Sequence, residues 1–458
     1  MGVEPTRQQL TLAAALARYC SPETPQDSVF ILNGYAGTGK TTVIGALVKA
    51  LPDVGLKAVL LAPTGRAAKV LAAHAAHSAS TIHRRIYRHA APGSPGSAAG
   101  LYRIGIAENR SSNTVFIVDE ASMIADDPEG SLLTDLLHYV FTGTNCRLIL
   151  SGDTAQLPPP GSDFSPAMAS ETFRRIGLHV MRATMTATVR QAATSGILYN
   201  ATLLRRNLQE TPIPLPRLRQ RPFADVSAIT SEDLLDALSS AYSEHGTIGT
   251  LLITRSNSRA VKFNLAIRSQ ILDYETELAP GEPLMIAKNN YYWTRQVKGM
   301  DFIANGDTAI VERIYGTEMR GDVTFADVAL RFPDHDITID TKILLSSLYC
   351  EAPALTPRVA DDLLHAVTDY PPGSVNPGPV PVVDLRNDTY YNALQVKYAY
   401  AVTCHKAQGG QWQSVFVDMA ALQPDALTSL DFYRWLYTAT TRAVDRLTYI
   451  SPPEQIID

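Results

Sequence analysis

Short apolar runs alternate with helix-like stretches through the first half of the chain. The runs rich in β-branched and large apolar residues are 29–32, 58–62, 115–118 and 147–151. Each is followed by Gly, Pro, Asp or Ser, residues that commonly end strands. This pattern predicts a parallel sheet flanked by helices, with the functional loops at the carboxyl edge of the sheet.

A second set of strand-like runs follows at 250–254, 396–402, 414–417 and 447–450. Between them, residues 281–384 are rich in Pro, Gly and Asp with short β-like runs, which predicts a β-rich insertion between the halves of a second α/β domain. Residues 211–222 are expected to form a connector. Residues 90–100 contain mainly Ala, Pro, Gly and Ser, and they predict an exposed hairpin or loop.

Length and composition limit the class of protein. The chain has 458 residues, 45% of them hydrophobic, which excludes a disordered or fibrous protein and suggests about three domains. No apolar run is long enough to span a bilayer, and Glu4 and Arg7 interrupt any secretory signal. The four cysteines are far apart and form no C-x-x-C pair, so we expect a reducing, cytoplasmic setting.

The net charge and its distribution point in opposite directions. A formal charge of −5 argues against a nucleic-acid partner. Residues 54–107, however, contain no Asp or Glu and carry seven Lys or Arg and four His. Such a basic block suits a phosphate backbone, although a solvated basic surface remains the alternative.

The segment Gly34-Tyr-Ala-Gly-Thr-Gly-Lys40-Thr41 fits the phosphate-binding pattern G-x-x-x-x-G-K-[ST]. A predicted strand precedes it and a helix-like stretch at 42–51 follows. Glycines let the backbone wrap round a phosphate, Lys40 would reach the β- and γ-phosphates, and the Thr41 hydroxyl would bind Mg²⁺. We therefore predict ATP and Mg²⁺ as cofactors, with a nucleotide set that includes Gly34, Gly37, Gly39, Lys40, Thr41 and Thr42.

Two further strand ends complete this chemistry. The run 115–118 ends in Asp119 and Glu120. Asp119 is placed to hold the Mg²⁺ shell, and Glu120 to orient or deprotonate the attacking water. A solvated acidic turn is less favoured because strand, spacing and phosphate loop occur together. Gln156, in the loop after 147–151, is expected to sense the γ-phosphate.

Together these elements resemble superfamily 1 helicases, specifically the 5′→3′ branch containing Dda, RecD and the PIF-type enzymes, with a layout closest to Dda-like helicases. The resemblance extends from Thr6 to Ile450 in the family's motif order. It implies that Gln9, in Thr6-Arg-Gln-Gln9, reads adenine. The form of the third motif, Gly152-Asp153 to Pro159, is the reason for choosing 5′→3′ polarity.

The resemblance also implies a set of nucleic-acid contacts and two arginine fingers. Arg190 and Arg442 would complete the ATP site from the opposite domain, and Gly409 joins the nucleotide set. For His405, a purely structural role remains an alternative. The implied DNA contacts are Pro63, Thr64, Arg66, Thr81, His83, Asn257, Ser258, Thr403, His405 and Lys406.

The resemblance gives a domain plan of the α/β class. Two RecA-like domains are expected at 1–83 plus 113–185 and at 186–280 plus 389–458. A pin or hairpin is expected at 84–112, and a domain containing a barrel similar to Src-homology-3 domains at 281–388. Two features depart from the family: Ala187 stands where a Glu is common, and the loop 92–100 has only small residues, so the residue that would separate the strands is undefined.

These features predict an ATP-dependent DNA helicase that moves 5′→3′ on a single strand and unwinds duplexes. The expected partners are single-stranded DNA, single-strand/duplex junctions and replication or repair proteins, with no membrane and a monomeric enzyme in a bacterial or phage-infected cell. Two alternatives remain: a translocase that displaces proteins without strong unwinding, and a non-catalytic DNA-binding subunit.

Overall fold

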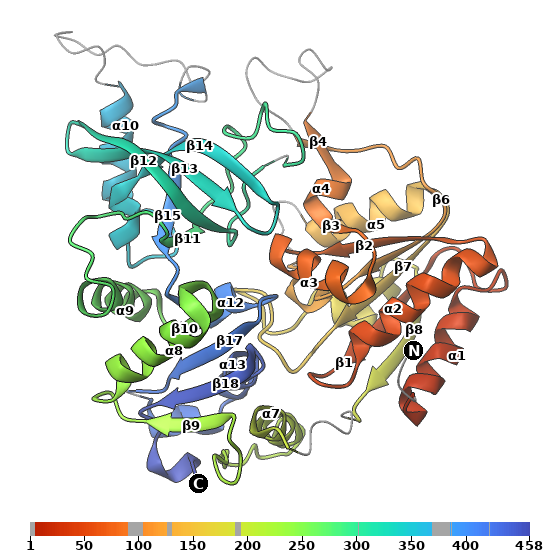
Figure 1. Ribbon diagram of the computed structural model, residues 1–458. Helices are drawn as coiled ribbons and strands as arrows, with labels where there is room; N and C mark the ends of the chain where they lie inside the picture. The colour runs from red at the N-terminus through yellow and green to blue at the C-terminus, as the bar shows by residue number, and fades with distance from the viewer. Residues whose placement is uncertain are drawn as a thin grey trace. The chain divides into compact units, whose positions relative to one another are not determined.

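The computed structural model describes residues 5–89, 104–125, 131–187, 194–300, 302–368, 385, 387–420 and 422–458. It divides into two compact units. Unit 1 comprises Met1–Tyr87, Ile106–Ser231 and Ala407–Asp458, and unit 2 comprises Arg88–Gly105 and Glu232–Lys406. Figure 1 shows the helices and strands that make up the units.

Unit 1 is built on a six-stranded parallel sheet, in which β1 lies between β7 and β8. The four strands predicted in this half of the chain are confirmed as β1, β2, β6 and β7. β3 and β8, which the apolar pattern did not predict, form its two edges. In the order β3-β2-β6-β7-β1-β8, the strands are Ala79–Thr81, Lys57–Ala62, Ser112–Val118, Thr144–Gly152, Ser28–Gly34 and His179–Met185.

Side chains alternate between the two faces of this sheet, so each strand contributes to two cores. Phe30 and Leu32 of β1 pack on one face, whereas Val29 and Ile31 pack on the other. The three helices α1, α2 and α3 cover the first face, and α4, α5 and α6 cover the second (Figure 1). In chain order these helices are Arg7–Tyr19, Lys40–Ala50, Gly65–Ala75, Ile82–Ile86, Leu132–Thr142 and Ser170–Arg174.

Each unit contains further parallel strands. In unit 1, β18 pairs in parallel with β17 and β9, and helices α7 and α13 accompany them; in unit 2, β10 pairs in parallel with β16. Unit 2 also contains α8 and α9. The bounds are Gly196–Asn207 for α7, Val226–Ile229 for β9, Leu234–Gly249 for α8, Thr250–Thr254 for β10, Asn257–Gln270 for α9, Ala401–Thr403 for β16, Trp412–Asp418 for β17, Leu430–Thr440 for α13 and Ala443–Ile450 for β18.

Unit 2 carries a closed five-stranded barrel, which confirms the predicted β-rich insertion. Its long antiparallel strands β12 and β13 pair along most of their length, and α10 packs beside β13 (Figure 1). The elements are β11 (Pro283–Ile286), β12 (Thr308–Arg320), β13 (Val323–Phe332), β14 (Ile337–Leu344), β15 (Leu394–Tyr398) and α10 (Pro357–Thr368).

The prediction of one strand at 396–402 is wrong, because the chain changes sheets inside this run. β15 closes the barrel, whereas β16 leaves it and pairs in parallel with β10. The Asn264 side chain holds the break by donating to the carbonyls of Tyr398 and Ala401 and accepting from the Ala401 N–H. The barrel therefore extends beyond the predicted boundary at 388.

Two short strands, β4 (Tyr87–His89) and β5 (Ile104–Ile106), pair in a small sheet at the predicted hairpin. The loop at 92–100 lies outside the described residues. Among the described residues, none of the helices has the length and apolar character required to cross a bilayer.

Candidate nucleotide and nucleic-acid sites

The phosphate-binding pattern forms the turn between β1 and α2. Gly37 and Gly39 have φ of +73° and +80°, a left-handed conformation that suits glycine. A Cβ at Gly34 would lie 2.5 Å from the Lys40 side chain, so the loop also requires a glycine there. The Lys40 Nζ donates to the Gly34 carbonyl. Thr41 and Thr42 occupy the first turn of α2, where helix N–H groups favour anions.

Asp119 and Glu120 follow β6 at the same edge of the sheet as this loop. The Ser151 hydroxyl donates to Asp119 over 2.8 Å. Burial and the neighbouring Glu120 raise the pKa of Asp119, while the nearby Lys40 ammonium opposes the shift. Glu120 has φ of +52°, a conformation that is strained for a residue with a Cβ and that occurs preferentially at functional sites.

A buried tyrosine connects the third predicted motif to the phosphate-binding loop. The Tyr437 hydroxyl, on α13, donates to the Asp153 carboxylate over 2.6 Å and accepts from the Ala36 N–H over 3.0 Å. Burial raises the pKa of Asp153, whereas Lys40 and the Tyr437 hydroxyl lower it. Burial also raises the pKa of Tyr437 well above its ordinary value, so its hydroxyl stays protonated and can donate.

Of the two predicted arginine fingers, Arg442 lies within the described part of the chain. Arg442 follows α13 and is buried in unit 1, with its guanidinium donating to the carbonyls of Thr438 and Gly410 and to the Thr441 hydroxyl. Each of its three guanidinium nitrogens therefore already donates to a protein acceptor in this state. Arg190 lies outside the described residues.

The loop after β7 is fixed by other segments of unit 1. The Leu157 N–H donates to the Thr438 hydroxyl, and its carbonyl accepts from the Gln408 side chain. Gln156 is buried, and its Oε1 is one of the buried polar atoms of the described residues without a hydrogen-bond partner. This amide oxygen can accept a hydrogen bond only from a donor such as a water molecule, whereas a phosphate could accept only from the Nε2 of the same side chain.

The amino-terminal glutamines have separate roles. Gln9 forms a capping box with Thr6 at the start of α1, with its Oε1 accepting from the Thr6 N–H. The sequence did not single out Gln8, whose Oε1 accepts from the N–H groups of Thr186 and Ala187 and whose Nε2 donates to the Thr186 hydroxyl. Gln8 thus ties α1 to the end of β8.

Most of the predicted first-half DNA contacts gather at one sheet edge in unit 1. Pro63 and Thr64 follow β2, and Thr81 ends β3, which pairs with β2. The Thr64 and Thr81 hydroxyls cap α3 and α4. His83 is the second residue of α4, which begins directly after Thr81, and burial lowers the pKa of His83.

Arg66 and Gly409 also lie at this edge. The Arg66 guanidinium stacks 3.8 Å from the centroid of the Trp412 ring and donates to the Gln411 carbonyl. Gly409 has φ of +74°, and a Cβ there would lie 3.0 Å from the Thr64 hydroxyl. Gly409 was predicted in the nucleotide set, but its neighbours place it beside the predicted nucleic-acid residues.

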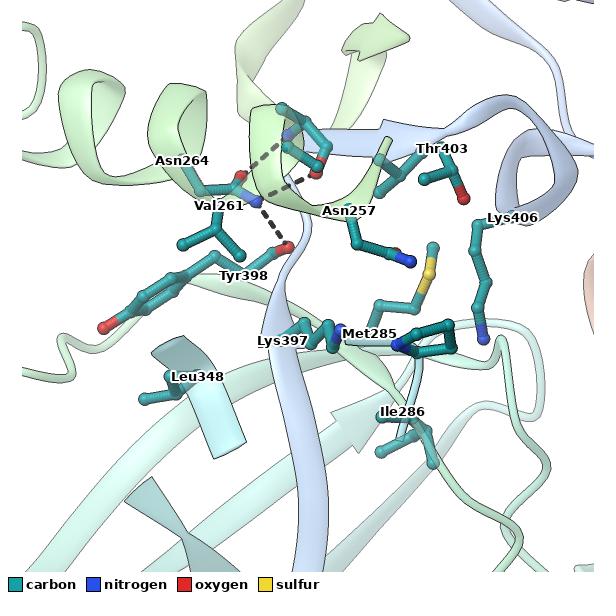
Figure 2. Close-up of a pocket in the computed structure, with 15 residues that line it drawn as sticks. Asn257, Val261, Asn264, Met285, Ile286, Leu348, Lys397, Tyr398, Thr403 and Lys406 are labelled. Carbon is teal, nitrogen blue, oxygen red and sulfur yellow. Dashed lines mark hydrogen bonds between the residues drawn. The ribbon is translucent and has the colours of Figure 1, made fainter. Parts of the chain in front are cut away.

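In unit 2, Asn257, Thr403 and Lys406 line one small cavity with Met285 and Lys397 (Figure 2). Its volume of about 30 Å³ is that of one or two water molecules, so it could admit a phosphate oxygen but not a base. The Lys406 Nζ donates to the Asn305 side chain. Burial, with a smaller contribution from Lys397, lowers the pKa of Lys406 to about 8.

The other predicted residues of this region lie outside the cavity. Ser258 is in the first turn of α9, and His405 is exposed in α12 (Cys404–Ala407); neither lines the cavity. Lys397, which the sequence did not single out, donates to the Ala352 carbonyl, and burial lowers its pKa. Its only sequence signal is a charge inside an otherwise apolar and aromatic run.

Comparisons with known families match two separate regions of the chain. The AAA domain family matches residues 9–211, and the UvrD-like helicase C-terminal domain family matches residues 398–449. These regions contain the phosphate-binding loop with Asp119 and Glu120, and the segment from Thr403 to Arg442.

Two relatives match over shorter segments. The ATP-dependent RecD2 DNA helicase of Deinococcus radiodurans is 36% identical over 132 residues, which cover 28% of this chain and 16% of the relative. An uncharacterised protein of Methanocaldococcus jannaschii is 35% identical over 147 residues, covering 30% of this chain and 12% of that protein. The chain therefore spans less than a fifth of the length of these curated relatives.

Solved structures similar to the whole chain include Pif1 helicases. The Bacteroides Pif1 helicase in complex with ADP-AlF3 and single-stranded DNA has a TM-score of 0.49 at 15% identity, over 100% of this chain and 95% of that one. The Candida albicans Pif1 helicase has a TM-score of 0.41 at 16% identity, over 100% and 96%. The chain is thus similar to an AAA domain family and a UvrD-like helicase C-terminal domain family in two separate regions, and to a RecD2 DNA helicase over a shorter segment.

Proposed function

We propose that this protein is an ATP-dependent DNA helicase that translocates 5′→3′ on single-stranded DNA and unwinds duplexes. The observation that supports it most is the arrangement in unit 1. There Tyr437 links the phosphate-binding loop and the loop after β7 to the α13 helix, and Ser151 of β7 bonds to Asp119 of the carboxylate pair after β6. Through the Tyr437 hydroxyl, a ligand that moves the phosphate-binding loop can act on α13.

In the proposed nucleotide site, Lys40 contacts the β- and γ-phosphates and Glu120 activates water. Mg²⁺ would be held by the Thr41 hydroxyl and Asp119, together with the phosphates of ATP. No cluster of three or more His, Cys, Asp or Glu suited to a metal occurs among the described residues. That composition fits Mg²⁺, which is usually held by one or two carboxylates, substrate phosphates and water.

The roles of Gln9 with adenine, Gln156 as sensor, and Arg190 and Arg442 as fingers are part of this proposal. Arg442 would exchange its bond to the Gly410 carbonyl for the γ-phosphate when the site closes. Because Gly410 adjoins Gly409, which packs against Thr64, this exchange would transmit nucleotide state to the proposed DNA-binding edge.

The proposed DNA contacts are polar or cationic groups suited to phosphates, which position a strand without reading its sequence. Thr64, Arg66 and Thr81 supply them in unit 1, and Asn257 and Lys406 in unit 2. The 5′→3′ direction rests on the third-motif resemblance. We also propose the Dda-like layout, with the pin at 84–112 and the barrel domain from 281 as insertions into two motor domains.

We further propose that the enzyme is monomeric and works in the cytoplasm of a bacterial or phage-infected cell. Its partners there would be replication or repair proteins. Cys20, Cys146, Cys350 and Cys404 are free thiols, which suits a reducing compartment.

ATPase measurements with and without an oligonucleotide test the proposal. We expect hydrolysis by the wild-type protein to be stimulated by single-stranded DNA. Hydrolysis that is absent under both conditions would instead favour a non-catalytic DNA-binding subunit.

A translocase that displaces proteins without strong unwinding is the second candidate, favoured by the small residues at 92–100. Displacement of streptavidin from biotinylated single strands, measured beside strand separation, distinguishes the two. Displacement without strand separation would favour the translocase.

A further inference from the structure

The loop 287–307 of unit 2 is one of the most aromatic and basic segments of the barrel. It connects β11 to β12 and contains Tyr291, Tyr292, Trp293 and Phe302. Residues 287–300 carry three cations, Lys288, Arg295 and Lys298, and no Asp or Glu. All three cations are exposed.

Backbone hydrogen bonds and aromatic contacts fix the conformation of this loop. Asn290 and Ile303 exchange both backbone hydrogen bonds at 2.8 Å. The Tyr291 and Phe302 rings stack at 5.1 Å, and the Trp293 Nε1–H donates to the Asn392 carbonyl over 2.8 Å. Because its shape is already fixed, the loop would lose little conformational entropy when a ligand binds.

Within this frame, Tyr292 is the ring available for stacking. It remains partly exposed, and its ring is nearly perpendicular to that of Trp293, with the centroids 5.0 Å apart and an interplanar angle of 80°. The Arg295 guanidinium lies over one face of the Tyr292 ring, 4.4 Å from its centroid, so a base would stack on the opposite face. An aromatic face with an adjoining guanidinium and exposed lysines is the combination that binds unpaired bases and their phosphates.

Hydrogen bonds join this loop to the cavity of Figure 2. The Asn289 side chain accepts from the Asn305 N–H over 2.7 Å, and the Asn305 side chain accepts from Lys406. A nucleic-acid strand whose phosphate contacts Lys406 would therefore lie close to the aromatic loop, which reaches Lys406 through Asn305.

We propose that residues 288–298 of this loop bind the bases of single-stranded nucleic acid, with Tyr292 as the stacking ring and Lys288, Arg295 and Lys298 as the phosphate contacts. The inference rests on the proposed function for the presence of a single strand. It adds a base-contacting site, whereas the residues proposed so far contact phosphates.

The test compares an oligothymidylate with an abasic strand of the same length, which keeps the phosphates but has no bases. We expect Tyr292→Leu to weaken oligothymidylate binding about tenfold and to leave abasic-strand binding within about twofold. Tyr292→Trp should restore oligothymidylate binding, and Lys298→Ala should weaken both strands alike and reduce the salt dependence.

Tyr315→Leu is the matched control. Tyr315 is 54% exposed on β12 of the same barrel and donates to Asp340, and its loss should change neither affinity. Thermal melting checks that each variant is folded. Unchanged oligothymidylate binding by Tyr292→Leu, or an equal loss on both strands, would overturn the stacking site while DNA binding stands. Failure of the wild-type protein to bind either strand would overturn the proposed function and this site with it.

Discussion

The nucleotide loop of unit 1 and the lysine cavity of unit 2 differ in the charged groups that surround their lysines. Lys40 donates to Gly34 within its own loop and lowers the pKa values of Asp119 and Asp153 against the effect of burial. Lys406 instead faces Lys397, and no carboxylate lines the described cavity. The first lysine has counter-charges beside it, whereas the second lacks them until an anion arrives.

This difference separates two kinds of binding. In unit 1 a nucleotide must replace existing bonds, so binding can change the protein's shape. In unit 2 an anion would relieve the cost of burying an ammonium, so binding should depend strongly on protonation and salt. The following predictions test the comparison, from the largest expected effect to the smallest.

Lys40→Ala should have the largest effect. Removing the ammonium from the phosphates should lower the ATPase rate by about 10³-fold, because it deletes a charge that stabilises the transferring phosphoryl group. Affinity for single-stranded DNA should remain within about twofold. Wild-type rates of DNA-stimulated hydrolysis by this variant would show that the nucleotide site is elsewhere.

Glu120→Gln should separate ATP binding from hydrolysis. The amide keeps the shape of the side chain but cannot accept a proton, so the hydrolysis rate should fall by about 10²-fold or more. Equilibrium binding of a fluorescent ATP analogue should be retained. If binding is lost as well, Glu120 supports the fold of the site rather than its chemistry.

Affinity for single-stranded DNA should fall as the pH rises through about 8, the pKa of Lys406. Below this pKa the Lys406 ammonium is charged and attracts a phosphate. Above this pKa the amine is neutral, so Lys406 must take up a proton when the phosphate binds. The loss should approach but not exceed about tenfold per pH unit. Lys406→Arg, which does not titrate in this range, is the control, and an equally steep profile for it would exclude Lys406 as the source.

Tyr437→Phe tests the link between α13 and the nucleotide loop with a smaller effect. The hydroxyl lowers the pKa of Asp153, so its loss should raise that pKa further. The acid limb of the ATPase pH profile should then move to higher pH if hydrolysis needs the Asp153 carboxylate, with a KM change of about threefold or more.

Tyr433→Phe is the control for this prediction. Tyr433 is on the same helix, but its hydroxyl bonds to Pro214 and Asn207, away from the nucleotide loop. An identical shift of the acid limb in both variants would mean that α13 acts only through its packing.

The sequence predicted the parts of this arrangement that are contiguous in the chain. The strand, glycine turn and helix around Lys40 lie within about 25 residues, and local geometry alone explains why glycines occur there. The same holds for Asp119 and Glu120, which directly follow their strand. The four strands of the first sheet were found because buried parallel strands are apolar throughout.

Features that depend on distant residues could not be predicted. Tyr437 reaches Asp153 and Ala36 across about 280 and 400 residues, and nothing in its local pattern distinguishes it from a core aromatic. The run 396–402 alternates like one strand, but Asn264 holds a break inside it. Lys397 became a candidate only when folding placed it beside Lys406.

Overhang-dependent unwinding tests the central claim most directly. Partial duplexes with a 5′ or a 3′ single-stranded tail are supplied with ATP and Mg²⁺, and Lys40→Ala serves as the inactive control. We predict strand separation from the 5′-tailed substrate, little from the 3′-tailed one, and none with Lys40→Ala. Unwinding only from 3′ tails, or undiminished unwinding by Lys40→Ala, would contradict the account.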